Sequence, residues 1–267
     1  MPCLPPSGPM VVAAATAHGI CHWCVDRTLR RQPWYAELSP AKRLDVDVNI
    51  TWLLLGTALP VLYVMSLPEL GASAVMRWRG TNEKTTLALI LHIGQSMYEL
   101  LMYVQSDKGA EFVLHHIVVI ITYGLVLHCG EMHFWAAWAG MVEATNPNLC
   151  ILQLGLLTGI GRGSLFEMAN GVCLWLLFLM IRVIGIPLWL VAYVKDVQSG
   201  MMASADVDRA EVAPGRPALA LAALRVLAPA VQLLLWAISC FWFQKLTAGM
   251  LKAVRGGGGT RQGAKGD

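Results

Sequence analysis

The long apolar stretches of this sequence restrict its fold more than any other feature. A helix of roughly 20 apolar residues crosses the hydrocarbon layer of a bilayer. We find six candidate stretches, over residues 49–66, 85–104, 111–128, 132–160, 166–194 and 218–246. Backbone polar groups in lipid must be hydrogen-bonded inside the protein, so such stretches form helices. We therefore predict an all-α, multi-pass membrane protein with about six transmembrane helices.

The composition supports this class and excludes others. Hydrophobic residues make up 56% of the 267 residues and charged residues only 14%, whereas soluble domains carry about 25% charged residues. The net charge of +3 is small, and no basic stripe is interleaved with aromatic residues. We therefore expect no nucleic-acid partner. Membrane lipids are the expected partners.

The apolar pattern divides the chain into three parts. Residues 1–48 form an N-terminal segment whose stretch Met10 to Val25 is either an extra helix or a signal-like segment. Residues 49–250 form the transmembrane domain. Residues 251–267 are basic and rich in glycine, and we expect this tail to be disordered.

Two local features are expected inside the transmembrane domain. Lys195 to Pro217 carries several acidic residues, prolines and glycines and is predicted to be a solvent-exposed loop. Asn146-Pro147 interrupts the fourth stretch. Because proline lacks a backbone donor and clashes with the preceding turn, a break or kink is expected there.

Polar residues recur along one face of the second stretch. At spacings of three, four and seven, this face carries Thr85, His92, Gln95, Ser96, Glu99 and Tyr103. Polar groups inside a membrane face a cavity or a partner helix. The stripe therefore lines either a cavity or a hydrogen-bonded helix seam.

A histidine pair, His115-His116, lies in the third stretch. Glu111 precedes His115 by four residues and shares its helix face, whereas His116 points about 100° away. Histidine serves as an acid, a base or a nucleophile near neutral pH. The pair is therefore a candidate catalytic site, with a purely structural role as the alternative.

Further polar residues fall in the later stretches. Arg182 lies near the centre of the fifth stretch and stays protonated, so it needs an acidic partner, carbonyl groups or water. The available acids are Glu99, Glu111 and Glu143. The sixth stretch carries a second polar stripe, whose members are seven residues apart. We expect Arg225, the first member, to extend toward the membrane interface. The members of this stripe are Arg225, Gln232 and Ser239.

Metal binding is not expected. A Cys-x-x-Cys element with neighbouring histidines occurs near the N-terminus, at His18, Cys21, His22 and Cys24. A structural zinc site usually needs a second ligand pair farther along the chain, and none is evident. We predict no metal and no resident cofactor.

Several short motifs resemble the TLC-domain family. Glu111-Phe-Val-Leu-His115-His116 resembles the family's histidine helix, and Tyr98-Glu99-Leu100 resembles its aromatic-acidic segment, with Glu where Asp is more usual. The element from Glu143 to Leu149 resembles a Glu-x-Ser-x-Pro-x-Leu sequence, with Thr145 in place of Ser. Looser likenesses occur in the last two helices, at Asn170, Phe178, Arg182 and the segment from Cys240 to Lys245.

The resemblance implies a barrel-like bundle of about six helices around a polar-lined cavity. Candidate catalytic residues are then His115 and His116. Candidate cavity or lipid-binding residues are His92, Gln95, Glu99, Glu111, Glu143 and Arg182. Ceramide synthases of this family carry paired acidic residues after the histidines, and this chain does not. The sequence is thus more similar to the TLC-domain-containing proteins.

Two functions follow from the resemblance, and a cargo receptor or scaffold that uses only the fold is a third alternative. The first is lipid binding or sensing that influences membrane lipid homeostasis. The alternative is an acyl-CoA-dependent N-acyltransferase that uses the histidine pair, with acyl-CoA as co-substrate and Glu111 or Glu99 orienting the histidine. The expected location is the endoplasmic reticulum membrane, with the plasma membrane as a second possibility.

Overall fold

The computed structural model describes residues 7–104, 109–200 and 218–256, and these residues form helices joined by short turns, without strands. The N-terminal helices are α1 (Ser7–Leu29), α2 (Pro33–Ala36), α3 (Pro40–Thr51) and α4 (Ala58–Leu70), with the π-helix η1 (Trp52–Gly56) between α3 and α4. The central helices are α5 (Ala74–Arg79), α6 (Glu83–Tyr103), α7 (Ala110–Cys129), α8 (His133–Gly140), the 3₁₀-helix η2 (Met141–Thr145) and α9 (Asn146–Thr158). The last helices are α10 (Leu165–Leu177), the π-helix η3 (Phe178–Ile184), α11 (Gly185–Gln198) and α13 (Ala218–Gly256).

Four helices among the described residues are long and apolar enough to cross a membrane. They are Pro40–Leu70, Ala110–Cys129, Leu165–Gln198 and Ala218–Lys252. The chain is therefore a multi-pass, all-helical membrane protein in its described parts. The second and fourth predicted spans, now α6 and α8–η2–α9, are not among the four. Both are helical, but α6 carries the polar stripe and a 3₁₀ segment divides the other. The count of six spans stays a prediction.

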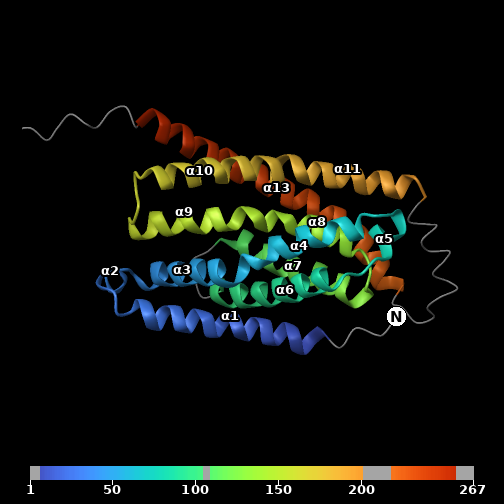
Figure 1. The fold of residues 1–267 in the computed structure, drawn as a ribbon, viewed down its shortest axis with the longest axis horizontal. Coiled ribbons are helices and arrows are strands. Elements are labelled where there is room, and N and C mark those ends of the chain that lie inside the picture. The colour runs from blue at the N-terminus through green and yellow to red at the C-terminus, as the bar shows by residue number, and fades with distance from the viewer. Residues whose placement is uncertain (1–6, 105–108, 201–217, 257–267) are drawn as a thin grey trace, which may run out of the picture.

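Most of the long helices run along a common axis, and α13 crosses them obliquely (Figure 1). In this view α10 and α11 form one edge of the bundle and α1 the opposite edge, with α6, α7 and α9 between them. Helix α1 packs mainly on α6 and α3. The contact with α6 is close at Gly94, where a Cβ atom would lie 2.5 Å from the Cβ of Ala14. The stretch from Met10 to Val25 is thus part of a helix of the bundle.

A buried hydroxyl connects the first three helices. The Tyr35 side chain of α2 is fully buried, and its Oη lies 2.6 Å from the Asp47 carboxylate of α3 and 3.1 Å from that of Asp26 of α1. Burial beside these two carboxylates raises the pKa of Tyr35 well above its ordinary value. The phenol therefore stays protonated and ties α1 to the transmembrane part.

The expected interruption at Asn146-Pro147 is confirmed. The α-helix α8 is followed by the 3₁₀-helix η2, and α9 then begins at Asn146 with Pro147 in its first turn. The backbone N–H groups of a first turn have no partner within the helix, so the N–H that proline lacks is not missed there. At the other end of the chain, α13 continues to Gly256, into the segment predicted as a tail. Residues 257–267 lie outside the described residues, and so does most of the predicted loop, residues 201–217.

An aromatic cluster fills one end of the core. Trp78, Trp135, Trp189 and Tyr193 are almost completely buried, with ring centroids 5.0–5.6 Å apart in most pairs. Arg225 lies over the Trp78 ring and 3.8 Å from the buried carboxylate of Glu131. A buried acid and an aromatic face thus hold the guanidinium within the bundle, beside the turn between α7 and α8. The expectation that Arg225 extends toward the membrane interface stays a prediction.

Candidate functional site

A pocket of about 110 Å³ collects most of the predicted site residues. Its wall combines α3, η1, α6, α7, η2, α9, η3 and α13. Seven of the eight predicted residues line it, namely His92, Gln95, Glu99, His115, His116, Glu143 and Arg182. We call this space the polar pocket. The stripe on α6 therefore faces a pocket along part of its length.

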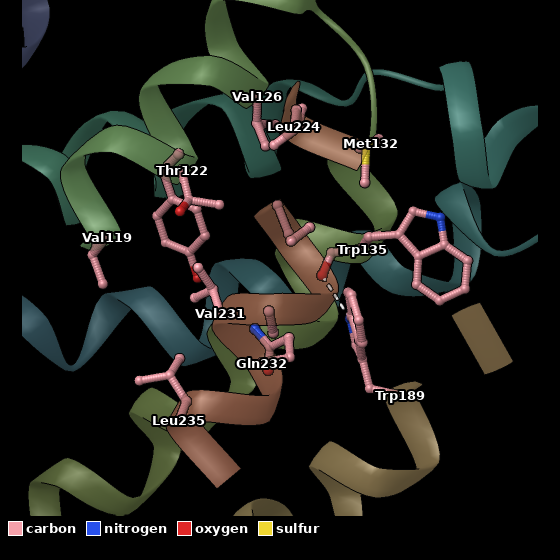
Figure 2. A pocket seen from close by; sticks show the side chains of 14 residues that line it. Val119, Thr122, Val126, Met132, Trp135, Trp189, Leu224, Val231, Gln232 and Leu235 are labelled. Atoms are coloured by element: carbon pink, nitrogen blue, oxygen red, sulfur yellow. Dashed lines mark hydrogen bonds between the residues drawn. The ribbon is translucent and has the colours of Figure 1, made fainter. Parts of the chain in front are cut away.

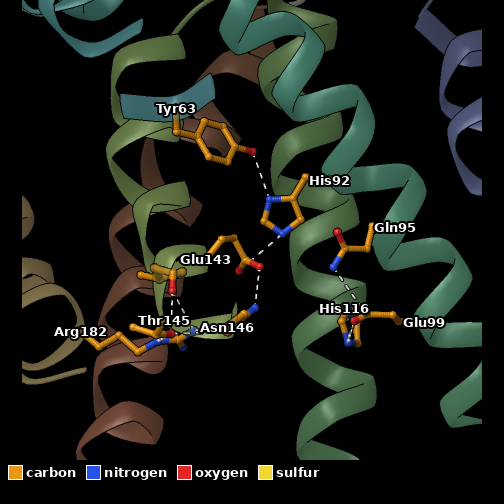
Figure 3. Close-up of polar contacts among 10 residues, drawn as sticks. Tyr63, His92, Gln95, Glu99, His116, Glu143, Thr145, Asn146 and Arg182 are labelled. Atoms are coloured by element: carbon orange, nitrogen blue, oxygen red, sulfur yellow. Dashed lines mark hydrogen bonds and ion pairs between the residues drawn. The ribbon is translucent and has the colours of Figure 1, made fainter. Parts of the chain in front are cut away.

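His92 lies at one end of the polar pocket. Its Nδ1 shares a hydrogen bond of 3.1 Å with the Tyr63 hydroxyl, and its Nε2 lies 3.7 Å from Oε1 of Glu143 (Figure 3). The Asn146 amide donates to the other Glu143 oxygen at 2.7 Å. His92 and Asn146 therefore hold the Glu143 carboxylate at the helix break between α8 and α9, and Tyr63 holds His92.

Arg182 is held by the same break. Its Nε donates to the Thr145 hydroxyl at 2.9 Å, and its Nη2 donates to the Val142 carbonyl at 3.1 Å and to Asn146 Oδ1 at 3.2 Å. Val142 and Thr145 belong to the 3₁₀ turn and Asn146 is the first residue of α9, so these acceptors lie where the regular α-helix is interrupted. The Phe178 ring, 5.1 Å from the guanidinium carbon, covers another side. The arginine is thus largely satisfied by the protein itself.

His116 pairs with Glu99 on the neighbouring helix. Its Nε2 lies 3.1 Å from Glu99 Oε2, and Gln95 donates to the other carboxylate oxygen at 3.0 Å (Figure 3). The Nδ1 atom of His116 is buried and has no hydrogen-bond partner among the described residues. If Nε2 carries the proton toward the carboxylate, Nδ1 of the neutral ring holds the lone pair. This is the geometry of an oriented histidine base.

His115 lines the same pocket, although it precedes His116 by one residue and the two side chains leave the helix in different directions. The two histidine rings pack edge to face with centroids 5.1 Å apart, and both line the wall. The 100° separation therefore places them side by side on the pocket wall. His115 is half-buried and makes no hydrogen bond to the described residues. It is thus the histidine of the pair that is open to a ligand.

Glu111 lies elsewhere. Its side chain is exposed in the first turn of α7, with the carboxylate folded against Gly109. An acid there interacts favourably with the positive end of the helix. Of the two acids expected to orient a histidine, only Glu99 touches one.

Several pocket residues were not identified from the sequence. They include Asn49, Tyr63, Asn146 and Cys150, of which Tyr63 acts through His92 and the other three line the wall. Asn146 had a usable signal, since it stands at the predicted break. Tyr63 and Cys150 had none, because each is a single residue in an apolar helix and such residues usually fill cores.

The N-terminal His/Cys group makes other contacts. His22 Nδ1 shares a hydrogen bond of 2.8 Å with Tyr98 Oη on α6, and the His18 ring stacks on the same tyrosine. No group of three or more potential metal ligands is gathered in the part of the chain that the structure describes. These histidines instead fasten α1 to α6, one residue from Glu99.

A model of the TLC domain matches residues 51–248, about three quarters of the chain. The chain belongs to the TLC-domain family. No curated protein and no solved structure matches it significantly. The TLC domain begins at the end of α3 and ends inside α13, so it contains every residue of the polar pocket except Val48 and Asn49. Helix α1 precedes the matched region.

Proposed function

We propose that this TLC-domain protein binds a membrane lipid with the polar headgroup in the polar pocket, and thereby senses or influences membrane lipid composition. The observation that carries the proposal is the half-buried His115 on a wall that also bears Glu99, Glu143 and Arg182. Ionisable groups are costly inside a membrane and usually mark a ligand or ion site. A headgroup with hydroxyl or amino groups suits a pocket with two carboxylates and one arginine.

The lack of paired acidic residues after His116 supports binding over ceramide synthesis. It also favours the branch of TLC-domain-containing proteins. We propose the endoplasmic reticulum as the membrane, on the resemblance alone. The preference for binding, the branch and the membrane are supported by the sequence motifs and not by the pocket geometry.

The test is lipid retention after purification in mild detergent, measured by mass spectrometry. We expect a defined lipid class to remain with the native protein. His115→Trp fills the open part of the pocket and should reduce retention by about tenfold, equivalent to roughly 1.4 kcal/mol. His128→Trp, on the exposed part of the same helix, is the matched control. Equal retention by native protein and His115→Trp would refute the proposal.

One observation favours a second candidate, acyl transfer from acyl-CoA to an amine. The Glu99–His116 pair next to the free His115 has the parts of a general base. In this reaction the amine nitrogen attacks the thioester carbonyl, the C–N bond forms, and the C–S bond breaks. The base takes the amine proton, and the CoA thiolate leaves and is protonated.

Incubation of the purified protein with acyl-CoA and a long-chain base separates the two functions. Product that is formed by the native protein and lost in both His115→Ala and His116→Ala would establish transfer. Lipid retention without any product would leave binding as the function. The His128→Ala variant again controls for a general effect of substitutions in α7.

A further inference from the structure

A second internal space lies beside the aromatic cluster and is independent of the polar pocket. It consists of two adjoining cavities, of about 40 and 100 Å³, which share Ala139, Trp189 and Gln232 as wall residues. The smaller cavity lies between α7, α8, α11 and α13 (Figure 2). The larger one extends along η2 and η3. We call the two together the apolar pocket.

A layer of rings separates the apolar pocket from the polar pocket. Tyr123 lines the smaller apolar cavity, and its ring packs on His92 of the polar pocket with centroids 5.0 Å apart. Tyr63 packs on both of these rings. The π-helix η3 serves both sides, because Ile181 lines the apolar pocket while Arg182 lines the polar one.

The mainly apolar wall includes a buried amide oxygen without a hydrogen-bond partner among the described residues. Gln232 of α13 is 6% exposed and lines both cavities, and its Oε1 atom is buried without a hydrogen-bond partner. Figure 2 shows its amide among the apolar side chains of the smaller cavity. The neighbouring Trp189 indole cannot satisfy it, because that N–H donates to the Trp135 carbonyl at 3.0 Å. A buried amide oxygen without a partner is energetically unfavourable, so a ligand that donates a hydrogen bond to it gains affinity.

The larger cavity reaches an exposed position on Leu165–Gln198, a helix long and apolar enough to cross a membrane. Met180 is part of its wall and is 58% exposed. A molecule that enters from the bilayer there would keep its hydrocarbon body in the cavity mouth and bring its polar end to Gln232. A hydroxyl fits the amide in either orientation, because it both donates and accepts.

We propose that the apolar pocket binds an amphiphile with a hydrocarbon body and a single hydroxyl group, and that this hydroxyl pairs with Gln232. The proposal does not depend on a ligand in the polar pocket. Gln232 selects for the hydroxyl, because an alkane would leave its amide unpaired.

The test uses 1-hexadecanol with a photoreactive diazirine in its chain, added to the protein in lipid nanodiscs. Labelled peptides are identified by mass spectrometry. We expect saturable labelling of the segment around Met180, competed by unlabelled 1-hexadecanol and not by hexadecane. Competition by both to the same degree would overturn the proposal, because the pocket would then select only for hydrocarbon.

Three variants make the test specific. Gln232→Leu keeps the size of the side chain and should reduce labelling by about three- to tenfold, as expected for one neutral hydrogen bond. Gln244→Leu, at an exposed position of the same helix, should leave it unchanged. Ala139→Leu fills the junction of the two cavities and should abolish labelling. Unchanged labelling in a folded Gln232→Leu protein, with the unfolding midpoint as control, would also overturn the proposal.

Discussion

At the scale of single residues, neighbouring positions in one helix have different environments. His116 is buried against Glu99, whereas His115 is half-buried and forms no hydrogen bond within the described part of the chain. Across the pocket, Arg182 is buried in a membrane helix and is stabilised by the acceptors of η2 and by its proximity to Glu143. The cost of burying its charge is therefore offset by several specific contacts.

The contacts of Arg182 give a stability prediction. Arg182→Leu leaves the Val142 carbonyl and the Glu143 carboxylate without their cationic neighbour. Breaking a buried charge arrangement of this kind costs about 3–5 kcal/mol. We expect a lower free energy of unfolding in detergent, measured by tryptophan fluorescence during denaturant titration. Arg162→Leu, at an exposed position between α9 and α10, should change it by less than about 0.5 kcal/mol. Similar values for both variants would contradict the structural role.

At the scale of elements, α1 is attached to the TLC domain by a small set of contacts. Gly94 allows the close approach of α1 and α6. Tyr98 of α6 contacts both His18 and His22 of α1. Tyr35 connects α2 with α1 and α3 through its hydroxyl group. Tyr98, which contacts α1, is adjacent on α6 to Glu99, which lines the polar pocket. A shift of α1 is therefore expected to affect the polar pocket.

The close approach at Gly94 gives the second prediction. In Gly94→Ala the new Cβ would lie 2.5 Å from Ala14 Cβ and 2.8 Å from the Ala15 nitrogen. Since backbone is involved, α1 must shift, and overpacking of this kind costs about 1–3 kcal/mol. Maleimide labelling of the half-buried Cys21 on α1 should become faster, and thermal stability should fall.

The matched control for that variant is Gly124→Ala on α7, where a new Cβ meets nothing within 4 Å. There, alanine should be neutral or should stabilise the helix by up to about 1 kcal/mol. Equal effects at the two glycines would show that α1 is not held by close packing on α6.

At the scale of the whole molecule, the open question is how many of the helices cross the membrane. Among the residues that the structure describes, four helices qualify by length and composition, yet α6 and α8–α9 run in a similar direction beside them (Figure 1). A helix with a polar stripe can cross the membrane when neighbouring helices cover that stripe. Most of the stripe on α6 is buried within the bundle. We therefore predict that both α6 and α8–α9 cross.

Single cysteines in a cysteine-free background test the crossings. Ala72→Cys and Val104→Cys flank α6, and His128→Cys and Ile160→Cys flank α8–α9, all at exposed positions. A membrane-impermeant maleimide should modify the members of each pair from opposite sides of sealed vesicles. Modification of one pair from the same side would show that the helix between them does not cross.

The sequence alone determined the helical membrane class, the break at Asn146-Pro147, the family and seven of the residues that line the polar pocket. These follow from the length of apolar runs, from the chemistry of proline and from the positions of polar residues, which are all local properties of the chain. Only the tertiary structure decided that Glu99 meets His116, that Glu111 stays outside, and that Gln232 faces an apolar pocket. Helical periodicity fixes which residues share a face, but the rotation of each helix and its neighbours fix which faces meet, and these depend on packing along the whole chain.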